Sequence, residues 1–556
     1  MKIRQLQIHN YRSIANQTIN FGDYSLLIGP NNSGKSNVLD ALRTVYEKEL
    51  KFDYERDFPK FQTSDQESWV EIEFELSPQE AETIKTEYLI NSNRFRIRRW
   101  LYPLEKVKQG LIGYENDTLS DNKFYGFTGV GQGKLGNVIY IPATSRLEEH
   151  TKLSGPSVLR DLINDILRPV VNSSTAYAEL RAHFNEFNEK IKTEFTPDSR
   201  SLSDLEKRIN DEIKDWGVVF NLDVNPPQVE DLIKNLICHT LTDSALNAEM
   251  NSEAFGHGLQ RHLVLTLIRI AAAYTPSKPE PKKKEFSPEM EVLLFEEPEA
   301  FLHPPQQDVL DTSLRQLSAQ PGRQVIAVSH SPLFVSNNTD DLTDLIRVRR
   351  VDGKTEAAQI TSEKLQQIFE DNQQLAAILG EEASSTEIEA VRHFLWLNPE
   401  RSTMFFANTV LIVEGLAEQV VVNYLLKTGN LITNSRGVFV LHTDGKYNIH
   451  RFMNLLGELE INHSVLHDKD TNKTGNEKKK HEALNKLIQE SQNQYTKAID
   501  TFPNNLEDFL GIKTDNDRWK KAAQVLLFVQ QNNITAEKLD AFKKKVSALL
   551  KALEIT

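Results

Sequence analysis

Three things are scarce in this chain of 556 residues: cysteine, long apolar runs and an excess of positive charge. The single cysteine, Cys238, excludes an intrachain disulfide and any metal site built from several thiolates. Any bound metal must therefore use oxygen or imidazole ligands. We interpret Cys238, at the end of the apolar stretch Leu232–Cys238, as a buried structural thiol.

No apolar run is long enough to span a bilayer, and Met1–Arg4 leads into an alternating strand pattern, not a signal peptide. We therefore expect a cytoplasmic protein with no membrane partner. The net charge of −14 counts mildly against nucleic-acid binding, although local patches decide binding more than the sum does. The length predicts two to four domains.

The first motif is a glycine-rich loop, Gly29-Pro-Asn-Asn-Ser-Gly-Lys-Ser36, which matches the pattern GxxxxGK[ST]. It has the required context, because an apolar strand (Tyr24–Ile28) precedes it and an amphipathic helix (Asn37–Leu50) follows. The glycines let backbone N–H groups face phosphates, Lys35 reaches the β- and γ-phosphates, and Ser36 offers its hydroxyl to Mg²⁺. The loop thus predicts an ATP site formed by Gly29, Asn31, Asn32, Ser33, Gly34, Lys35 and Ser36.

Two further apolar strands, Glu291–Phe295 and Gln324–Ser329, end in polar residues. We expect Glu296 to take the metal-side place at the first strand tip and Glu297 to activate water. Aspartate is usual in the first place, so Glu296 predicts a shifted metal and slow hydrolysis. His330, after the second strand, is predicted to sense the γ-phosphate.

The segment Ser252–Arg261 places Gly256 and Gly258 before an apolar helix, where freed backbone donors favour an anion. Its position is that of an ABC-type signature, although its sequence is not LSGGQ. Between the nucleotide motifs, residues 158–216 are charged and helix-periodic, which predicts an inserted helical subdomain.

Four acidic residues lie at the tips of two predicted strands in the last third of the chain. Glu414 follows an apolar run and Glu418 comes one helical turn later, while Asp468 and Asp470 end another run. If the strands are neighbours in a parallel sheet, the four carboxylates converge at its carboxyl edge. Such anions repel one another unless divalent cations bind, and all-oxygen ligands favour Mg²⁺ or Mn²⁺. We predict that these four residues bind metal.

Taken together, the nucleotide motifs and the opening Asn10-Tyr-Arg-Ser-Ile14 resemble the ATPase heads of the SMC and RecF group. That resemblance implies that Arg12 approaches the nucleotide and that two subunits close on ATP. The acidic C-terminal part resembles a Toprim domain. This implies second-metal support from Glu507 and a catalytic lysine at Lys520 or Lys521, of which we favour Lys521. His442, His450 and His467 are interpreted as structural, and Asp444-Gly445-Lys446 fits either a phosphate contact or a plain turn.

Nearly the whole chain resembles the OLD (overcoming lysogenization defect) nuclease family, which includes Gabija-type and retron-associated nucleases. The expected fold is α/β: an ABC-type ATPase head (1–155 and 229–400), a helical dimerisation insert (156–228) and a C-terminal Toprim domain (401–556). The resemblance implies an ATP-regulated, metal-dependent DNA endonuclease or nickase in bacterial antiphage defence. It further implies a homodimer or higher homo-oligomer and a co-encoded partner, either a protein or a retron nucleic acid.

Two other readings remain open from the sequence. One is a DNA-binding ATPase scaffold that recruits a partner effector and does not cut DNA. The other is a primase or a topoisomerase, and a topoisomerase would also need a nucleophilic tyrosine and a strand-passage domain.

Overall fold

The computed structural model describes residues 1–47, 50–103, 110–126, 135–143, 151, 158–222, 231, 235, 237, 240–250, 254–274, 286, 288, 290–335, 339–379, 398–433, 437–515 and 517–554. The chain forms two compact units: Met1–Ala143 with Lys283–Thr556, and Thr144–Lys282. Cys238 lies outside the described residues. Within those residues, no helix is both long and apolar enough to cross a membrane.

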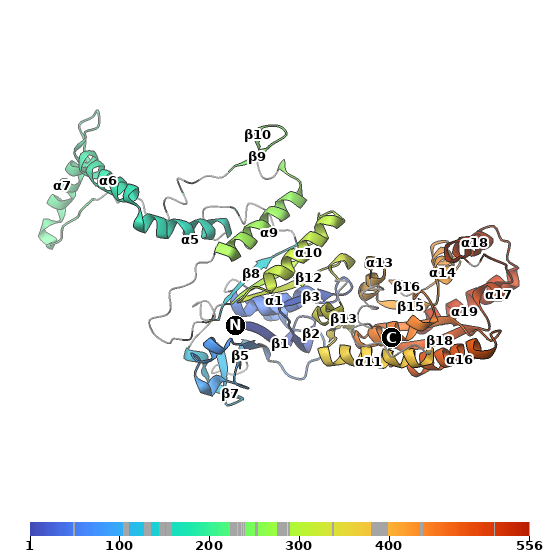
Figure 1. The fold of residues 1–556 in the computed structure, drawn as a ribbon. Coiled ribbons are helices and arrows are strands. Elements are labelled where there is room, and N and C mark those ends of the chain that lie inside the picture. Colours follow the sequence, from blue (N-terminus) through green and yellow to red (C-terminus); the bar gives the residue numbers. More distant parts are fainter. Residues whose placement is uncertain are drawn as a thin grey trace. The chain divides into compact units, whose positions relative to one another are not determined.

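A six-stranded sheet in the order β14-β13-β3-β12-β11-β8 forms the centre of the first unit (Figure 1). Its strands are β3 (Tyr24–Ile28), β8 (Asn137–Ile141), β11 (Glu291–Glu296), β12 (Arg323–Val328), β13 (Leu345–Val351) and β14 (Lys354–Gln359). All pairs are parallel except β13 with β14. Strands β3 and β12 are buried along their whole length, as expected for continuous apolar runs in a parallel sheet. The carboxyl ends of β3, β11 and β12 consequently meet at one edge.

A second sheet is antiparallel, in the order β2-β1-β4-β5-β6-β7. It comprises β1 (Lys2–Tyr11), β2 (Ile14–Asn20), β4 (Ser68–Glu75), β5 (Arg94–Tyr102), β6 (Leu111–Glu115) and β7 (Thr118–Lys123). The alternating patterns of Trp69–Leu76 and Phe95–Trp100 predict antiparallel strands, and β4 and β5 do pair antiparallel, with Ile72 opposite Ile97 in the core. The side chain of Gln324 in β12 hydrogen-bonds the backbone N–H and C=O of Ile3 in β1. These two bonds connect the two sheets.

The helices of this head are α1 (Lys35–Tyr46), α2 (Tyr54–Asp57), α3 (Pro78–Ala81) and α10 (Pro304–Ser318). Helix α1 starts directly after the glycine-rich loop, with Gly34 as its N-cap. It buries Val38, Leu42 and Val45 in the same apolar core as the two sheets. The loop is therefore held between a fully buried strand and a firmly packed helix.

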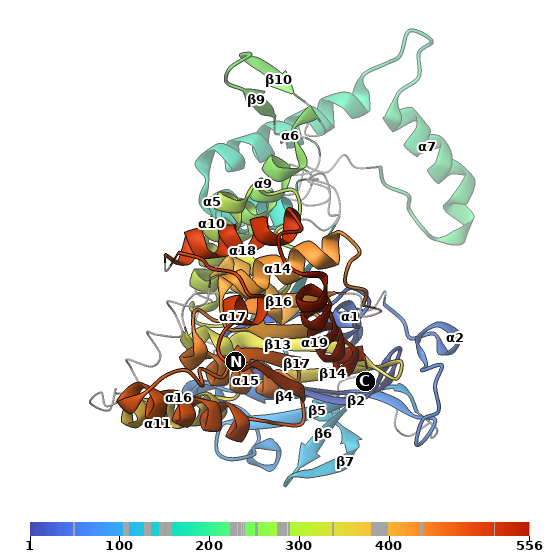
Figure 2. The ribbon, with the colours of Figure 1, turned by 90° about the vertical axis from the view of Figure 1, so that its right-hand side faces the viewer.

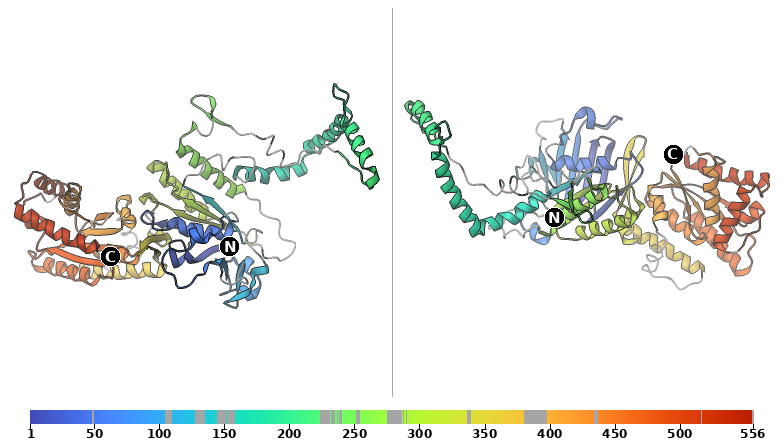
Figure 3. Two further views of the ribbon diagram at one scale, coloured as in Figure 1. Left: turned by 180° about the vertical axis from the view of Figure 1, so that it is seen from behind. Right: turned by 90° about the horizontal axis from the view of Figure 1, so that it is seen from above.

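The polar sequence from residue 330 to about residue 407 predicts helix, but the structure forms the β13–β14 hairpin within it. The strand was missed because arginines alternate with apolar residues in Leu345–Val351. Its alternating pattern and the turn at Asp352-Gly353 are nevertheless hairpin signals. Helix α11 (Ser362–Leu379) follows the hairpin and packs on α15 and α16 (Figure 3).

A four-stranded parallel sheet, β16-β15-β17-β18, organises the C-terminal part. The strands are β15 (Thr409–Val413), β16 (Val438–His442), β17 (Asn462–Asp468) and β18 (Thr496–Phe502). Helices α14 (Leu416–Lys427), α17 (Leu506–Leu510), α18 (Arg518–Gln530) and α19 (Ala536–Glu554) share one apolar core with it. Helices α15 (Ile449–Glu458) and α16 (Gly475–Glu490) lie on the opposite side, as Figure 2 shows. A short helix, α13 (Pro399–Ser402), precedes β15.

The second unit is mainly helical. It contains α5 (Val158–Ser173), α6 (Thr175–Thr193), α7 (Leu202–Ile213), α9 (His257–Tyr274) and a small hairpin of β9 (Leu241–Asp243) and β10 (Ala248–Met250). Helix α5 packs on α9, and α6 packs on α7. Large apolar side chains stay exposed here, with Phe195 at 70% and Trp216 at 84% of full exposure.

Candidate nucleotide and metal sites

The glycine-rich loop lies at the carboxyl end of β3 and lines a cavity of about 350 Å³. Lys35 is buried, and its ammonium donates to the carbonyls of Gly29 at 3.0 Å and Pro30 at 2.8 Å. Burial lowers the pKa of Lys35 to about 8, against the opposing effect of Glu297, Glu299 and Glu296. Phosphate oxygens could take the place of these two backbone carbonyls as acceptors for the Lys35 ammonium.

Two glycines of the loop are required by their neighbours in the β13–β14 hairpin. A Cβ at Gly29 would lie 2.0 Å from the carbonyl oxygen of Val348, and a Cβ at Gly34 would lie 2.1 Å from Thr355 Oγ1. Both glycines also have positive φ angles, 136° and 105°. Thr355 further donates its hydroxyl to the Ser33 carbonyl at 2.9 Å. The hairpin therefore touches the phosphate loop at both of its glycines.

The neighbouring strand ends bring the predicted metal and water residues to the same cavity. Glu296 and Glu297, from the end of β11, and His330, after β12, line the cavity with the loop. Glu296 Oε2 accepts from the Tyr140 hydroxyl at 2.8 Å, and His330 Nε2 lies 3.8 Å from Glu297 Oε1. Burial and the nearby Lys35 charge lower the pKa of His330. A neutral imidazole beside a phosphate loop can accept or donate a hydrogen bond to a terminal phosphate or its water.

Three other predicted nucleotide residues, Arg12, Gly256 and Gly258, are not part of this cavity's described lining. Arg12 pairs with Asp57 at 2.9 Å and with Asp40 at 2.6 Å, so its guanidinium braces α1 against α2. Gly256 and Gly258 lie at the start of α9 in the second unit, where a Cβ at Gly256 would meet nothing within 4 Å. Whether either group contacts nucleotide stays a prediction.

The four predicted metal ligands lie at the carboxyl edge of the C-terminal sheet. Strands β15 and β17 are parallel neighbours, with Val413 opposite Leu466, so Glu414 and Asp468 end adjacent strands. The backbone N–H of Asp468 donates to Glu414 Oε2 at 3.0 Å. Glu418, one turn into α14, accepts from the Gly415 N–H at 3.0 Å and is buried. The juxtaposition on which the metal prediction depends is therefore present.

The electrostatics of this acidic cluster are those of crowded carboxyl groups. Burial raises the pKa of Asp468, and the neighbouring Glu414, Glu418, Asp470 and Glu507 raise it further. Burial also raises the pKa values of Glu414 and Glu418. Asp468 Oδ1 is buried and has no hydrogen-bond partner among the described residues. A carboxyl group with an orphaned buried oxygen amid other carboxyls fits a divalent cation, which would relieve both penalties.

Two lysines stand in this cluster. Lys446 is 2% exposed and ion-pairs with Asp470 through its ammonium. Its charge lowers the pKa of Glu414 against the larger effect of burial. Lys521 lies 2.9 Å from Glu507, whereas Lys520 lies 3.8 Å from Asp515 and, among the described residues, has no ion pair with a member of the acidic cluster. Of the two candidate catalytic lysines, the geometry favours Lys521.

Two carboxylates of the cluster are ion-paired with lysines, and the cluster's carboxylates do not surround one common position as metal ligands would. Within the part of the chain that the structure describes, no three acidic or histidine side chains are placed to hold one ion. The Lys446–Asp470 and Lys521–Glu507 pairs direct two carboxylates towards ammonium groups. Metal binding by these residues thus requires side-chain rotations that release one or both pairs.

Sequence reasoning missed Lys446 as part of the acidic cluster and did not consider His481. His481 Nδ1, from α16, lies 2.9 Å from Asp470 Oδ2 and 3.3 Å from the Lys446 ammonium. Asp444-Gly445-Lys446 leads into a 3-10 turn whose lysine ion-pairs with Asp470, and a phosphate contact by this segment stays a prediction. His442, His450 and His467 are buried, as expected for structural histidines.

Comparison with protein families gives two matches. Residues 25–336, more than half of the chain, match the family described as "AAA domain, putative AbiEii toxin, Type IV TA system". Residues 405–470 match "Overcoming lysogenization defect protein-like, TOPRIM domain". The second match covers β15 to the last predicted ligand, Asp470.

Individual relatives agree with these families. The Old nuclease of Escherichia phage P2 is 22% identical over 84% of this chain and 77% of its own length. Endonuclease GajA of Bacillus cereus strain VD045 is 23% identical over 84% of this chain and 75% of its own length. Among solved structures, an SMC head bound to the C-winged helix domain of ScpA has a TM-score of 0.38 and 16% identity, covering 66% of this chain and 100% of that one. The mixed and parallel sheets and the two family matches confirm the predicted α/β class with a C-terminal TOPRIM domain.

Proposed function

This chain is a member of the OLD family, an AAA-type ATPase joined to a Toprim domain, and from that premise we propose that it is an ATP-regulated, divalent-metal-dependent DNA endonuclease or nickase. The domain assignment proposed with it is an ATPase head over 1–155 and 229–400, a helical insert over 156–228 and a Toprim domain over 401–556. The similarity to relatives named Old nuclease and Endonuclease GajA supports the proposal.

One observation carries the proposal most directly. Glu414 and Asp468, which are 54 residues apart in sequence, join through a 3.0 Å hydrogen bond at the tips of adjacent parallel strands. Burial and mutual repulsion both disfavour such a cluster in a purely structural role. A metal-dependent reaction is a direct reason for a fold to retain it.

In the proposed mechanism, Glu414, Glu418, Asp468 and Asp470 would hold Mg²⁺ or Mn²⁺, and Glu507 would support a second ion. Bound metal would supply activation of water and stabilisation of charge on a phosphodiester. Glu507 favours the protonated form of Lys521, because their ion pair raises the lysine pKa against the effect of burial. Once released from Glu507, its ammonium can steady negative charge on the cleaved phosphate.

Incubating the purified full chain with supercoiled plasmid, with and without Mg²⁺ or Mn²⁺ and ATP, tests this function. We expect nicked or linear DNA only when metal is present. Binding without any cutting in either metal would favour the scaffold alternative. Relaxation without nicked product would favour a topoisomerase.

Regulation by ATP is proposed to act through the β13–β14 hairpin. Val348 lies against Gly29 of the phosphate loop, and its two neighbours in the strand reach the Toprim domain. Arg347 donates to the carbonyls of Ala407 at 3.1 Å, Glu460 at 3.2 Å and Leu459 at 3.3 Å. Arg349 Nη2 lies 2.5 Å from Glu460 Oε2. One strand thus contacts both the nucleotide loop and the domain that carries the acidic cluster.

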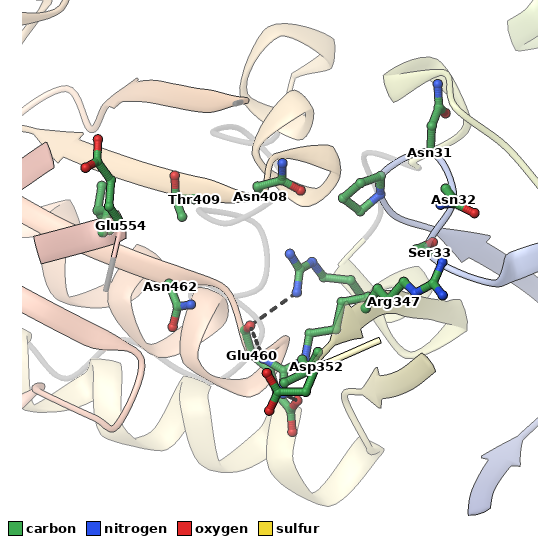
Figure 4. A pocket seen from close by; sticks show the side chains of 15 residues that line it. Asn31, Asn32, Ser33, Arg347, Asp352, Asn408, Thr409, Glu460, Asn462 and Glu554 are labelled. Carbon is green, nitrogen blue, oxygen red and sulfur yellow. Dashed lines mark hydrogen bonds and ion pairs between the residues drawn. The ribbon is translucent and has the colours of Figure 1, made fainter. Parts of the chain in front are cut away.

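A cavity of about 730 Å³ borders this connection and leaves room for it to move. The phosphate loop residues Asn31, Asn32 and Ser33 line one side, and Asn408, Thr409 and Glu460 of the C-terminal part line the other (Figure 4). A shift of the loop on binding ATP would be transmitted by β13 across this space. The proposal therefore names Arg347 as the main coupling residue.

Arg347→Met is expected to uncouple cleavage from ATP while preserving ATP binding. The methionine keeps much of the buried stem but loses the three carbonyl contacts, a loss of about 2 kcal/mol at this contact. We expect the ratio of cleavage rates with and without ATP to approach one, whichever direction ATP acts in the native protein. Plasmid cleavage and ATP binding, measured in parallel, check this.

Arg350→Met is the matched control, because Arg350 lies on the same strand and contacts only the Gly353 carbonyl, at 3.1 Å, among the hydrogen bonds described. It should respond to ATP as the native chain does. A native ATP response in Arg347→Met, with native thermal stability, would rule out the coupling role.

We further propose that the chain acts as a homodimer or higher homo-oligomer in cytoplasmic antiphage defence, with a co-encoded protein or nucleic acid as its trigger. Phe195 and Trp216, highly exposed in the helical insert, are apolar side chains that a second subunit would cover, which supports self-association. Gly256 and Gly258 are proposed to close on the nucleotide of a second subunit.

A further inference from the structure

A lysine-rich segment follows directly from the acidic cluster. Residues 469–480, here named the lysine track, contain five lysines against two acidic residues, in a chain whose net charge is −14. Lys469, Lys473, Lys478 and Lys479 are exposed, and Lys480 is half-buried. Lys478 lies 3.8 Å from Glu482. The other four have no carboxylate partner among the described residues. Unneutralised ammonium groups are therefore concentrated at one place.

The track is anchored beside the proposed metal site. Its first turn closes through a hydrogen bond from the Lys473 N–H to the Asp470 carbonyl at 3.2 Å. Asn485 donates to the Lys469 carbonyl at 3.0 Å, which fixes the other side of the turn to α16. The track ends at Lys480, next to His481, whose ring lies 2.9 Å from Asp470. Both ends of the track thus adjoin the same metal-ligand candidate.

These features favour the binding of a polyanion, and one that must reach the acidic cluster. Carboxylates there repel a phosphodiester, so a substrate needs nearby positive charge to approach. Lysine supplies flexible point charges that neutralise phosphates without reading base sequence. An acidic protein would be equally attracted, but it would have no reason to be placed beside a phosphodiester-cleaving edge.

We propose that the lysine track binds the phosphate backbone of the DNA strand that enters the Toprim site. This inference rests on the proposed nuclease function, because it takes DNA as the substrate. It goes beyond that function by naming the surface that guides DNA and the side from which the strand arrives.

The test is the triple variant Lys473→Gln, Lys479→Gln, Lys480→Gln in the full chain. Binding of a fluorescent DNA duplex is measured by anisotropy over a series of KCl concentrations, without divalent metal. Each phosphate contact contributes about 0.9 to the slope of log affinity against log salt concentration. We expect the triple variant to lower that slope by about 2 to 3 and to weaken binding at least about tenfold at 0.1 M salt.

The matched control is Lys538→Gln, Lys544→Gln, Lys551→Gln on α19, which removes the same charge from exposed positions away from the track. It should keep the native slope. Mn²⁺ binding, followed by electron paramagnetic resonance, should be unchanged in the track variant, which would exclude damage to the acidic cluster.

The outcomes separate the two proposals. If the native chain cuts plasmid and the track variant keeps the native salt slope, the track proposal is overturned while the nuclease stands. If the native chain does not cut but the track variant loses slope, the track binds DNA and the nuclease proposal fails. If both triple variants lose slope equally, the effect is one of net charge, and the track is rejected.

Discussion

Asp468→Asn is expected to abolish metal-dependent cleavage and to leave ATP binding unchanged. The substitution removes the carboxylate most crowded by its neighbours and with it a central metal ligand. The loss of a group that stabilises charge in the transition state slows reactions by about a hundredfold or more, and removal of a metal ligand should have at least that effect. Plasmid cleavage and nucleotide binding, measured on the same preparation, check both halves of the statement. Glu414→Ala should behave in the same way.

Asp508→Asn is a suitable control, since Asp508 is exposed on helix α17, next to Glu507 in the sequence, and is not among the groups that raise the pKa of Asp468. It should cut at the native rate. Thermal stability of Asp468→Asn in EDTA should not fall, because asparagine removes a repelling charge at a buried position. Native cleavage by Asp468→Asn in Mg²⁺ or Mn²⁺ would refute the assignment of the nuclease site.

The second large effect is expected at the phosphate loop. Lys35→Ala should weaken ATP binding by about a hundredfold, near 3 kcal/mol, as when a buried charged hydrogen-bonding group is deleted from an interface. Its ammonium is the one buried cation of the loop. Hydrogen bonds to two loop carbonyls hold it at the cavity that it lines. Titration with a fluorescent ATP analogue measures the change.

Lys51→Ala, at an exposed position in the same head, provides the comparison. The Lys35 variant should also lose any response of plasmid cleavage to ATP, while its cleavage without nucleotide stays at the native level. Tight ATP binding by Lys35→Ala would show that the loop does not act as the nucleotide site.

Much of this fold can be predicted from the sequence, because buried parallel strands are continuous apolar runs. Tyr24–Ile28 and Thr409–Val413 are such runs, and both are completely buried. The residues that follow them, a glycine loop and an acid, were therefore assigned to strand tips correctly. Convergence of Glu414 with Asp468 depended only on β15 and β17 being neighbours, which the sheet order confirms.

The remaining features depend on partners that are distant in sequence. Strand β13 carries arginines whose acceptors are carbonyls of residues 407, 459 and 460, so its sequence pattern looked exposed and polar. Lys446 is buried and ion-pairs with a carboxylate 24 residues away in the sequence. No local pattern distinguishes it from a solvated turn lysine. Arg12, predicted from family resemblance to approach the nucleotide, is paired with two aspartates, and its contact with nucleotide stays a prediction.

The contact between the phosphate loop and the β13–β14 hairpin has a thermodynamic consequence. Strand β3, which runs into the loop, pairs with β13 over Leu26–Ile28, and Thr355 donates to the Ser33 carbonyl, so opening either segment breaks hydrogen bonds of the other. The loop and the strand therefore belong to one cooperative unit of local unfolding, with a shared opening free energy. Free energy released by a ligand at the loop stabilises that entire unit by mass action, including the arginine contacts at its far side.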